Sequence, residues 1–287
     1  MTAAKEISAR RHARLLLVAE HDALGVGGLN TALQAAVVTG AVPSSVQCSL
    51  RLRTGNGTER SPFPSQVFGP QLETCLATEL DAIGLAATGP ETLFGLLADA
   101  CSQASQPLMV DANLIDRDGR LMVDDPAVDI LRRHILSSAT LFMANVHDLE
   151  VLTGRGADEV GGMKDGARRL HDLGASRVLV TGGRTEGHAL DIYFDGEGII
   201  EFGDDRIPVS SRLRGAGSCL LSAIAAARAR QIELPQAIQQ AKELTSAAIR
   251  AAAPSHWGPV VQPMAAAWSA MDMDPTPIVQ PLDPGKD

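Results

Sequence analysis

The chain has 287 residues, a formal net charge of -9 and 45% hydrophobic side chains, few of them aromatic. This length fits one large α/β domain or two small ones, with a core built mainly from Ala, Leu, Val and Gly. The negative charge argues against a general binder of nucleic acids or acidic membranes, and no run of about 20 apolar residues could span a bilayer.

Both ends of the chain are polar. Residues 1–14 carry a small basic cluster that no signal-peptide cleavage pattern follows, and residues 274–287 are rich in Pro and Asp. We therefore expect flexible tails on either side of a single domain over residues 15–263. The four cysteines are scattered without the spacing of a zinc site, which indicates buried free thiols and a cytoplasmic location.

The first predicted elements are a strand, a glycine-rich turn and a helix. Residues 15–19 form a short apolar run, which is typical of a buried strand. The turn over residues 20–28 is followed by apolar residues at helical spacing. The sequence thus predicts a βα unit whose strand ends at Ala19 and whose turn contains Asp22 and Gly27.

Strands and helices then alternate along the chain. Residues 46–52 alternate apolar and polar side chains, as a half-exposed strand does, and residues 54–64 have the Gly, Asn and Pro content of a loop. We expect a helix over residues 65–80, a strand over 81–86 and a helix over 93–101. This order predicts one α/β domain with a largely parallel sheet and helices on both faces.

Asp111 ends an apolar run, residues 108–111, that predicts a buried strand. A polar residue at the carboxyl end of a strand in an α/β sheet points toward the ligand crevice. A carboxylate that caps a turn explains the same pattern, so the position alone leaves both interpretations open.

A further predicted strand, residues 140–144, leads into Asn145 and then into a helix that carries Asp148 and Glu150. Acidic residues in the first turn of a helix complement its dipole, and this explains Asp148 without any ligand. The next strand ends at Thr181, with Gly183 two residues later. A hairpin is predicted beyond it.

The most informative stretch is a glycine-containing turn before a helix that is apolar on all sides. Gly215 and Gly217 allow the backbone to turn tightly there. The N-terminus of such a helix offers unpaired N–H groups and a positive dipole end to a phosphate, and Arg212 and Arg214 could add positive charge. A plain tight turn is the alternative, because the run has neither a P-loop lysine nor a complete dinucleotide fingerprint.

The run over residues 215–226 reads Gly-Ala-Gly-Ser-Cys-Leu-Leu-Ser-Ala-Ile-Ala-Ala. It resembles the C-terminal signature of the ribokinase-like superfamily, and most closely the hydroxymethylpyrimidine/phosphomethylpyrimidine kinases of thiamine synthesis, which read Gly-Thr-Gly-Cys-Thr-Leu-Ser-Ser-Ala-Ile. The segments after residues 19, 108, 145 and 178 are similar to the same family. The resemblance covers roughly residues 15–260.

This resemblance implies a ribokinase-like three-layer domain that phosphorylates hydroxymethylpyrimidine or its phosphate with ATP and Mg²⁺. A homodimer is common in the superfamily. The implied roles are transfer of the phosphoryl group at Gly215, Ala216, Gly217 and Ser218, substrate binding at Ala19, Asp22 and Gly27, nucleotide binding at Asn145, Thr181, Gly183 and Arg214, and metal binding at Asp111, Asp148 and Glu150.

Several positions depart from the family pattern. Ser218 replaces the family's Cys, Thr181 replaces a Lys and Ala32 replaces a substrate-side Asp, while the pyrimidine-binding motif Thr-Ala-x-Thr-Ala-Gln-Asn is not found. A serine hydroxyl cannot act as a base near neutral pH, so Asp22 and Asp111 are hypothetical replacements. We expect a slow or altered kinase; the alternative is a pseudokinase that binds a pyrimidine or nucleotide without chemistry. A sugar or nucleoside kinase is disfavoured because those branches carry Asp at the Ser218 position.

Overall fold

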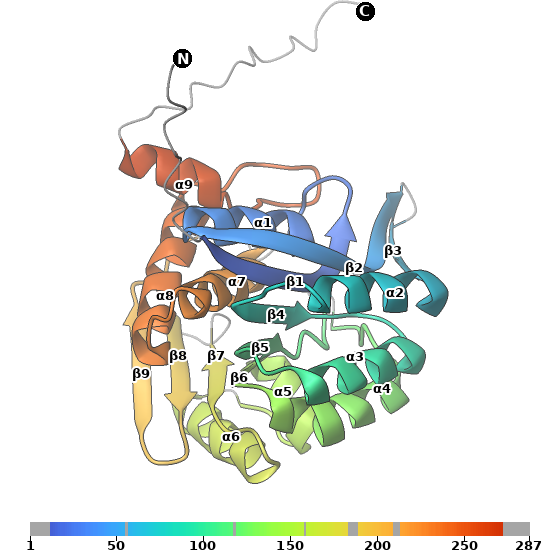
Figure 1. Cartoon of the computed structure of the whole chain (residues 1–287). Coiled ribbons are helices and arrows are strands. Elements are labelled where there is room, and N and C mark those ends of the chain that lie inside the picture. The colour runs from blue at the N-terminus through green and yellow to red at the C-terminus, as the bar shows by residue number, and fades with distance from the viewer. Residues whose placement is uncertain are drawn as a thin grey trace, which may run out of the picture.

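The computed structural model describes residues 12–54, 57–116, 119–157, 159–182, 189–208 and 213–271. These residues form one twisted sheet with helices on both faces (Figure 1). The strands are β1 (Ala13–Asp22), β2 (Ala41–Thr54), β3 (Gly57–Pro62), β4 (Ala82–Ala86), β5 (Leu108–Asp111), β6 (Leu141–Asn145), β7 (Val178–Thr181), β8 (Ala189–Phe194) and β9 (Ile199–Asp204).

The helices are α1 (Gly28–Val38), α2 (Ser65–Leu76), α3 (Glu91–Gln103), α4 (Asp125–Ile130), α5 (Val146–Thr153), α6 (Val160–Asp172), α7 (Ala216–Ala229), α8 (Leu234–Arg250) and α9 (Pro263–Ala270). A π-helical turn, Leu131–Ile135, and a 3-10 turn, Leu136–Ser138, continue α4. The domain therefore extends slightly beyond the expected limits of 15–263, because β1 begins at Ala13 and α9 ends at Ala270.

The strand order in the sheet is β3-β2-β1-β4-β5-β6-β7-β8-β9. The six strands from β2 to β7 in this order run parallel, and β3, β8 and β9 are antiparallel to their neighbours. The predicted α/β fold with a largely parallel sheet is confirmed. All the parallel strands end at one edge of the sheet, where α/β folds bind their ligands.

Side chains along each strand point alternately to the two faces of the sheet, and this divides the core into two layers. Leu15 and Leu17 of β1 pack with α1, α7 and α8 on one face, while Leu16 and Val18 pack with α2 and α3 on the other. Successive side chains of a strand point to opposite faces, so a strand covered on both sides is apolar throughout. This is why the short apolar runs of the sequence correctly predicted buried strands.

The expected loop over residues 54–64 is wrong in part, because β3 lies within it and pairs antiparallel with β2. None of the β3 residues is buried. An edge strand that covers no core needs no apolar alternation, which is the signal used to predict strands from sequence.

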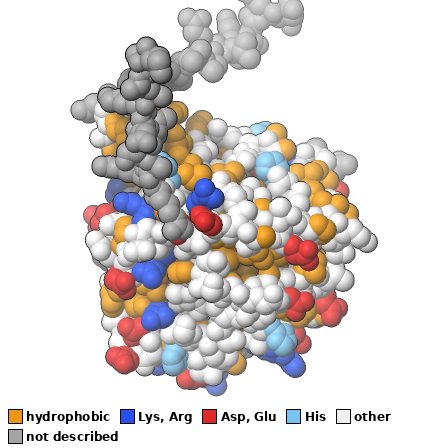
Figure 2. Space-filling view, viewed as in Figure 1, with side chains coloured by type: hydrophobic (Ala, Val, Ile, Leu, Met, Phe, Trp, Pro, Cys, Tyr) orange, Lys and Arg blue, Asp and Glu red, His pale blue; other side chains and the backbone are white. Residues whose placement is uncertain are grey.

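Acidic and basic side chains are interspersed along the edge of the molecule that β8, β9 and α8 form (Figure 2). None of the helices in the described part of the chain combines the length and the apolar character that a membrane crossing requires.

Candidate active site

A cavity of about 770 Å³ opens at the carboxyl ends of the parallel strands. Ala19, Asp111, Asn145 and Thr181 line it, and each lies at or near the end of a different strand, β1, β5, β6 and β7. These residues converge because parallel strands bring their carboxyl ends to one edge of the sheet. Their roles in binding stay predictions.

Gly215 and the first turn of α7 form part of the cavity wall. Gly215, Ala216, Gly217 and Ser218, which we call the 215–218 loop, all line the cavity, together with Arg214. Gly215 is the N-cap of α7, and the N–H group of Cys219 makes the first bond within the helix, to the Gly215 carbonyl at 2.9 Å. The N–H groups of the three residues between them have no partner inside the helix, so they are available to an anion.

Two glycine loops pack directly against each other at this wall. Gly27, which also lines the cavity, and Gly215 have φ angles of 92° and 90°, in the region that favours glycine. A Cβ atom on Gly27 would lie 3.3 Å from the Gly215 nitrogen, and one on Gly215 would lie 2.9 Å from the Thr31 Oγ1. The close approach of α1 and α7 therefore fixes the position of the 215–218 loop.

We expect Gly28→Ala to lower the free energy of unfolding by about 1–3 kcal/mol, which thermal unfolding would measure. Gly28 has a φ of 58°, and an added Cβ would lie 2.5 Å from the backbone oxygen of Glu20, which cannot move without shifting β1. Gly95→Ala is the matched control, because no atom lies within 4 Å of its added Cβ inside α3. The control should stabilise by about 0.5–1 kcal/mol. Equal melting temperatures for the two variants would contradict the tight packing described here.

Asp111 faces the 215–218 loop. Its Oδ2 atom lies 3.5 Å from the position that a Cβ on Gly217 would occupy. Burial and the nearby charge of Asp148 raise the pKa of the Asp111 carboxyl to about 7, against a backbone hydrogen bond from Asn113 that lowers it. The site thus holds a carboxyl group that changes its charge near neutral pH, beside N–H groups that suit an anion.

Asp148 does not line the cavity; it holds the backbone next to the cavity through hydrogen bonds. Its Oδ1 atom accepts hydrogen bonds from the backbone N–H groups of Leu114 and Ile115, both at 3.0 Å, and its Oδ2 accepts one from the Asn145 side chain at 2.6 Å. Asn145 and Asp148 also form a capping box at the start of α5. Asp148 is fully buried, so it shapes the loop after β5 and the start of α5.

Glu150 and Asp22 also lie away from the cavity surface. Glu150 is exposed on α5. Asp22 is buried and accepts the Nε–H of Arg53 at 2.7 Å and the backbone N–H of Leu24 at 3.0 Å. Neither acid lines the cavity with Asp111, because the carboxylate of Asp22 is engaged by Arg53 and Glu150 is exposed on α5. Their roles in binding substrate and metal stay predictions.

Gly183 and Arg212 lie outside the described residues.

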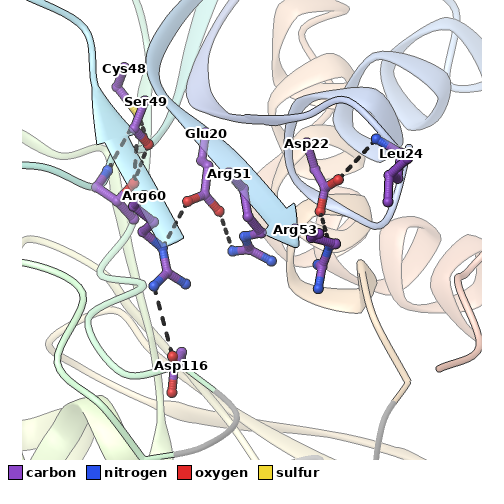
Figure 3. A network of polar contacts seen from close by, with 10 residues as sticks. Glu20, Asp22, Leu24, Cys48, Ser49, Arg51, Arg53, Arg60 and Asp116 are labelled. Atoms are coloured by element: carbon purple, nitrogen blue, oxygen red, sulfur yellow. Dashed lines mark hydrogen bonds and ion pairs between the residues drawn. The ribbon is translucent and has the colours of Figure 1, made fainter. Parts of the chain in front are cut away.

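In place of Asp22, the carboxylate of Glu20 reaches the cavity (Figure 3). It forms ion pairs with Arg51 of β2 and with Arg60 of β3, the latter at 2.8 Å, and Arg60 lies 3.8 Å from Asp116. Arg51 and Asp116 also line the cavity, whereas Arg60 does not. One end of the cavity, from β1, β2 and the loop after β5, is therefore strongly polar.

Sequence reasoning missed an ion pair at the other end of the cavity. The Nζ atom of Lys242 lies 2.6 Å from the Asp191 Oδ2 and 3.0 Å from the Ala189 carbonyl, and the other Asp191 oxygen accepts the Gly182 N–H. Lys242 is buried and lines the cavity with Thr245 and other residues of α8. The available signal was a lysine on the mainly apolar face of an amphipathic helix, where an unpaired charge is costly.

Cys219 does not take the place of a thiol at position 218. It is fully buried and packs with residues of the α8–α9 side, while Ser218 is half-buried and faces the cavity. Burial raises the pKa of the Cys219 thiol to about 11, although a hydrogen bond with Thr245 lowers it. A thiol in this position remains protonated at neutral pH and cannot act as a base.

Comparison with known proteins identifies the family. The family model described as phosphomethylpyrimidine kinase matches residues 22–264 of the chain. The chain belongs to this family. It is 32% identical over 251 residues to the thiamine biosynthesis bifunctional protein ThiED of Geobacter sulfurreducens, a match that covers 84% of this chain and 50% of that protein. The chain thus spans about half the length of this relative.

Two further similarities agree with the family and the fold. The hydroxymethylpyrimidine/phosphomethylpyrimidine kinase of Mycobacterium bovis is 26% identical over 249 residues, which cover 84% of this chain and 90% of that protein. The ADP complex of Bacillus subtilis pyridoxal kinase superposes with a TM-score of 0.83 at 22% identity, over 92% of this chain and 100% of that one. The ribokinase-like architecture expected from the 215–218 loop is confirmed.

Proposed function

We propose that this member of the family transfers the terminal phosphoryl group of ATP to the hydroxymethyl or phosphate group of a small pyrimidine. The observation that carries this proposal is the 215–218 loop, whose free N–H groups line a cavity beside the carboxyl of Asp111. Phosphoryl transfer depends mainly on positioning and on stabilising charge, which such a loop supplies. The names of the relatives, a thiamine biosynthesis protein and a hydroxymethylpyrimidine/phosphomethylpyrimidine kinase, support the same reaction.

In this proposal the N–H groups of residues 216–218 bind the oxygens of the transferring phosphoryl group. Their alignment is fixed before the substrates arrive, because the two glycine loops and α7 hold them. A preorganised donor of this kind contributes about 10²–10³-fold to the rate. Arg214, on the same wall, adds positive charge, and Asn145 and Thr181 at the ends of β6 and β7 line the side that would receive the nucleotide.

The residues present fit a Mg²⁺ ion that is held mainly through the phosphates of the nucleotide. Mg²⁺ prefers oxygen ligands, keeps several of its waters and needs only one or two carboxylates from the protein. Asp111 would supply that carboxylate, while Asp148 has both oxygens occupied by hydrogen bonds and would orient the neighbouring loop. When bound, Mg²⁺ neutralises negative charge on the phosphates.

The expected homodimer and the expected cytoplasmic location of the protein stay predictions.

We expect Ser218→Cys to raise kcat by about tenfold, because a cysteine near the reacting oxygen is partly ionised at mildly alkaline pH and its thiolate can accept a proton that a serine hydroxyl cannot. Asp22, one of the two hypothetical bases, lies outside the cavity, which leaves Asp111 as the candidate. The increase in kcat of the Ser218→Cys variant should grow as the pH approaches the ordinary thiol pKa of about 8.5. Ser218→Ala is the control and should change kcat by no more than about threefold. Loss of activity in both variants would assign the hydroxyl itself a role.

The proposed function is tested by following ADP release with ATP, Mg²⁺ and hydroxymethylpyrimidine, with and without the pyrimidine. Pyrimidine-dependent release of ADP is the expected result. Calorimetry on the same samples separates the alternatives, since binding of ATP or the pyrimidine without turnover would identify a pseudokinase. Absence of both binding and turnover would mean that the cavity serves another ligand.

A further inference from the structure

The backbone of Arg214, which leads into the 215–218 loop, is held by the segment between α8 and α9. Its N–H group donates to the Pro259 carbonyl at 2.8 Å, and its carbonyl accepts the N–H of Val261 at 3.0 Å. A Cβ on Gly215 would lie only 3.0 Å from the Val261 Cγ2. This segment therefore supports the N-terminus of α7, and a shift in it would move the 215–218 loop with it.

A tight turn over residues 255–258, which carries Trp257, directly precedes this support. The Ser255 Oγ accepts the N–H of Trp257 at 3.2 Å and donates to the Gly258 carbonyl at 2.5 Å, and the Gly258 N–H donates to the Ser255 carbonyl at 3.1 Å. These bonds fix the shape of the turn. Ser255 and His256 are exposed, so this part of the turn gains little from apolar burial, whereas the half-buried indole of Trp257 joins the turn to β2.

The indole ring of Trp257 lies over the guanidinium of Arg53, at the end of β2. The Arg53 Cζ is 5.3 Å from the ring centroid, which is within the range of a cation–π contact. The Nε–H of Arg53 donates to the Asp22 Oδ2 at 2.7 Å, and both of these charged side chains are 2% exposed (Figure 3). The Arg53 Nη2 is buried and has no hydrogen-bond partner among the described residues. Asp22 thus keeps the planar guanidinium in one orientation, and its face forms a platform for Trp257.

The same ion pair reaches Gly215 by a second route. The Asp22 Oδ1 accepts the backbone N–H of Leu24 at 3.0 Å, and the Asp22 carbonyl accepts the side-chain amide of Asn30 at 2.7 Å. These bonds order the turn that contains Gly27, whose added Cβ would lie 3.3 Å from the Gly215 nitrogen. The two routes begin at one buried ion pair and meet at the N-terminus of α7.

We propose that Trp257 is a positioning residue for phosphoryl transfer. Its indole, stacked on Arg53, holds the 255–258 turn against β2. The turn in turn fixes the backbone of Arg214 and the 215–218 loop. The inference rests on the proposed function, because it assigns the effect to the step in which this loop binds the transferring phosphoryl group. An interaction made mainly in the transition state is seen in kcat, whereas uniform binding is seen in KM.

The test compares steady-state kinetics with ATP, Mg²⁺ and hydroxymethylpyrimidine for the wild type, Trp257→Leu and Trp257→Phe. We expect Trp257→Leu to lower kcat about tenfold and to change both KM values by no more than about twofold, because a small misplacement of a group that binds the reacting atoms slows the chemical step. Trp257→Phe keeps an aromatic face for Arg53, so its kcat should stay within about threefold of the wild type.

Trp268→Leu is the matched control. Trp268 is the second of the two tryptophans in the chain; it is exposed on α9 and does not line the cavity. Its replacement should leave kcat at the wild-type value. A wild-type kcat for Trp257→Leu, or an effect on KM alone, would overturn the proposal. Equal losses of kcat in Trp257→Leu and Trp257→Phe would also overturn it, since the loss would then not depend on an aromatic face.

Arg53→Lys tests the same contact if Trp257→Leu does not fold. Lysine keeps a positive charge beside Asp22 but loses the planar guanidinium on which the indole stacks. This variant should lower kcat about threefold with unchanged KM values. A wild-type kcat in Arg53→Lys would count against the proposal in the same way.

Failure of the proposed function can be distinguished from failure of this inference. If the wild type forms no phosphate ester, the proposed function fails, and the affinity for inorganic phosphate, measured by calorimetry, decides this inference alone. Free phosphate would bind the N–H groups of the 215–218 loop directly, so Trp257→Leu should bind it about tenfold more weakly than Trp268→Leu. Equal affinities of the two variants, or no phosphate binding by the wild type, would overturn the inference.

Discussion

Replacing Gly217 with Asp is expected to lower the rate of phosphoryl transfer by at least about 10³-fold while the fold is kept. The new carboxylate would lie at the N-terminus of α7, at the point where the transferring phosphoryl group is bound in our account, and near the Asp111 carboxyl. It would repel the phosphate and occupy its site. The helix itself should tolerate the change, because acidic residues are favourable in the first turn.

The Gly217→Ala variant separates the effect of the added negative charge on the rate from the effect of the added side-chain volume. The added Cβ would lie 3.5 Å from the Asp111 Oδ2, an ordinary contact distance, so the alanine variant should lose no more than about tenfold. Steady-state kinetics with ATP and the pyrimidine, together with circular dichroism to confirm folding, provide the measurement. A folded Asp variant with an unchanged rate would remove the 215–218 loop from the mechanism.

Replacing Asp111 with Asn should have two opposite effects: a large loss of activity, and a gain in stability at alkaline pH. Activity should fall by about 10²-fold or more, because the variant loses both the carboxylate that would bind Mg²⁺ and the hypothetical proton acceptor. Stability should rise because burial makes the charged form of Asp111 unfavourable in the folded protein, with a pKa of about 7.

The sign of the pH dependence follows from proton binding. Between about pH 4 and about pH 7, the unfolded state has lost this proton and the folded state retains it, so the wild type becomes less stable as the pH rises. Above that window the loss is constant, at about 2–4 kcal/mol. Urea unfolding at about pH 5 and about pH 8, without nucleotide or Mg²⁺, should show a larger fall for the wild type than for Asp111→Asn. If the free energy of unfolding falls equally in the wild type and in Asp111→Asn between these two pH values, ionisation of Asp111 does not destabilise the folded protein.

Much of the fold could be predicted from the sequence because its signals are local. Short apolar runs predicted the buried strands, and the end of one of these runs placed Asp111 at the edge of the sheet where the cavity lies. The glycines before α7 were recognisable because a tight turn onto a buried helix leaves few alternatives. The edge strand β3 was missed because it carries no apolar alternation.

The rest of the site depends on contacts that no local pattern reveals. Lys242 and Asp191 are separated by 51 residues, and they meet only when α8 packs beside β8. Glu20 was read as part of a turn, whereas it lies within β1 beside a register shift that turns it toward the cavity. Glu150 was predicted from its neighbourhood to Asp148, but two steps along a helix carry a side chain to the opposite side.

The most direct test of the account is whether a new phosphate ester forms, and whether its formation depends on the 215–218 loop. Phosphorus NMR of a mixture of the enzyme, ATP, Mg²⁺ and hydroxymethylpyrimidine would detect the ester itself. We predict a pyrimidine phosphate signal with the wild type and none with a folded Gly217→Asp variant. A wild type that binds the substrates but forms no ester, or a variant that forms it at the wild-type rate, would contradict the account.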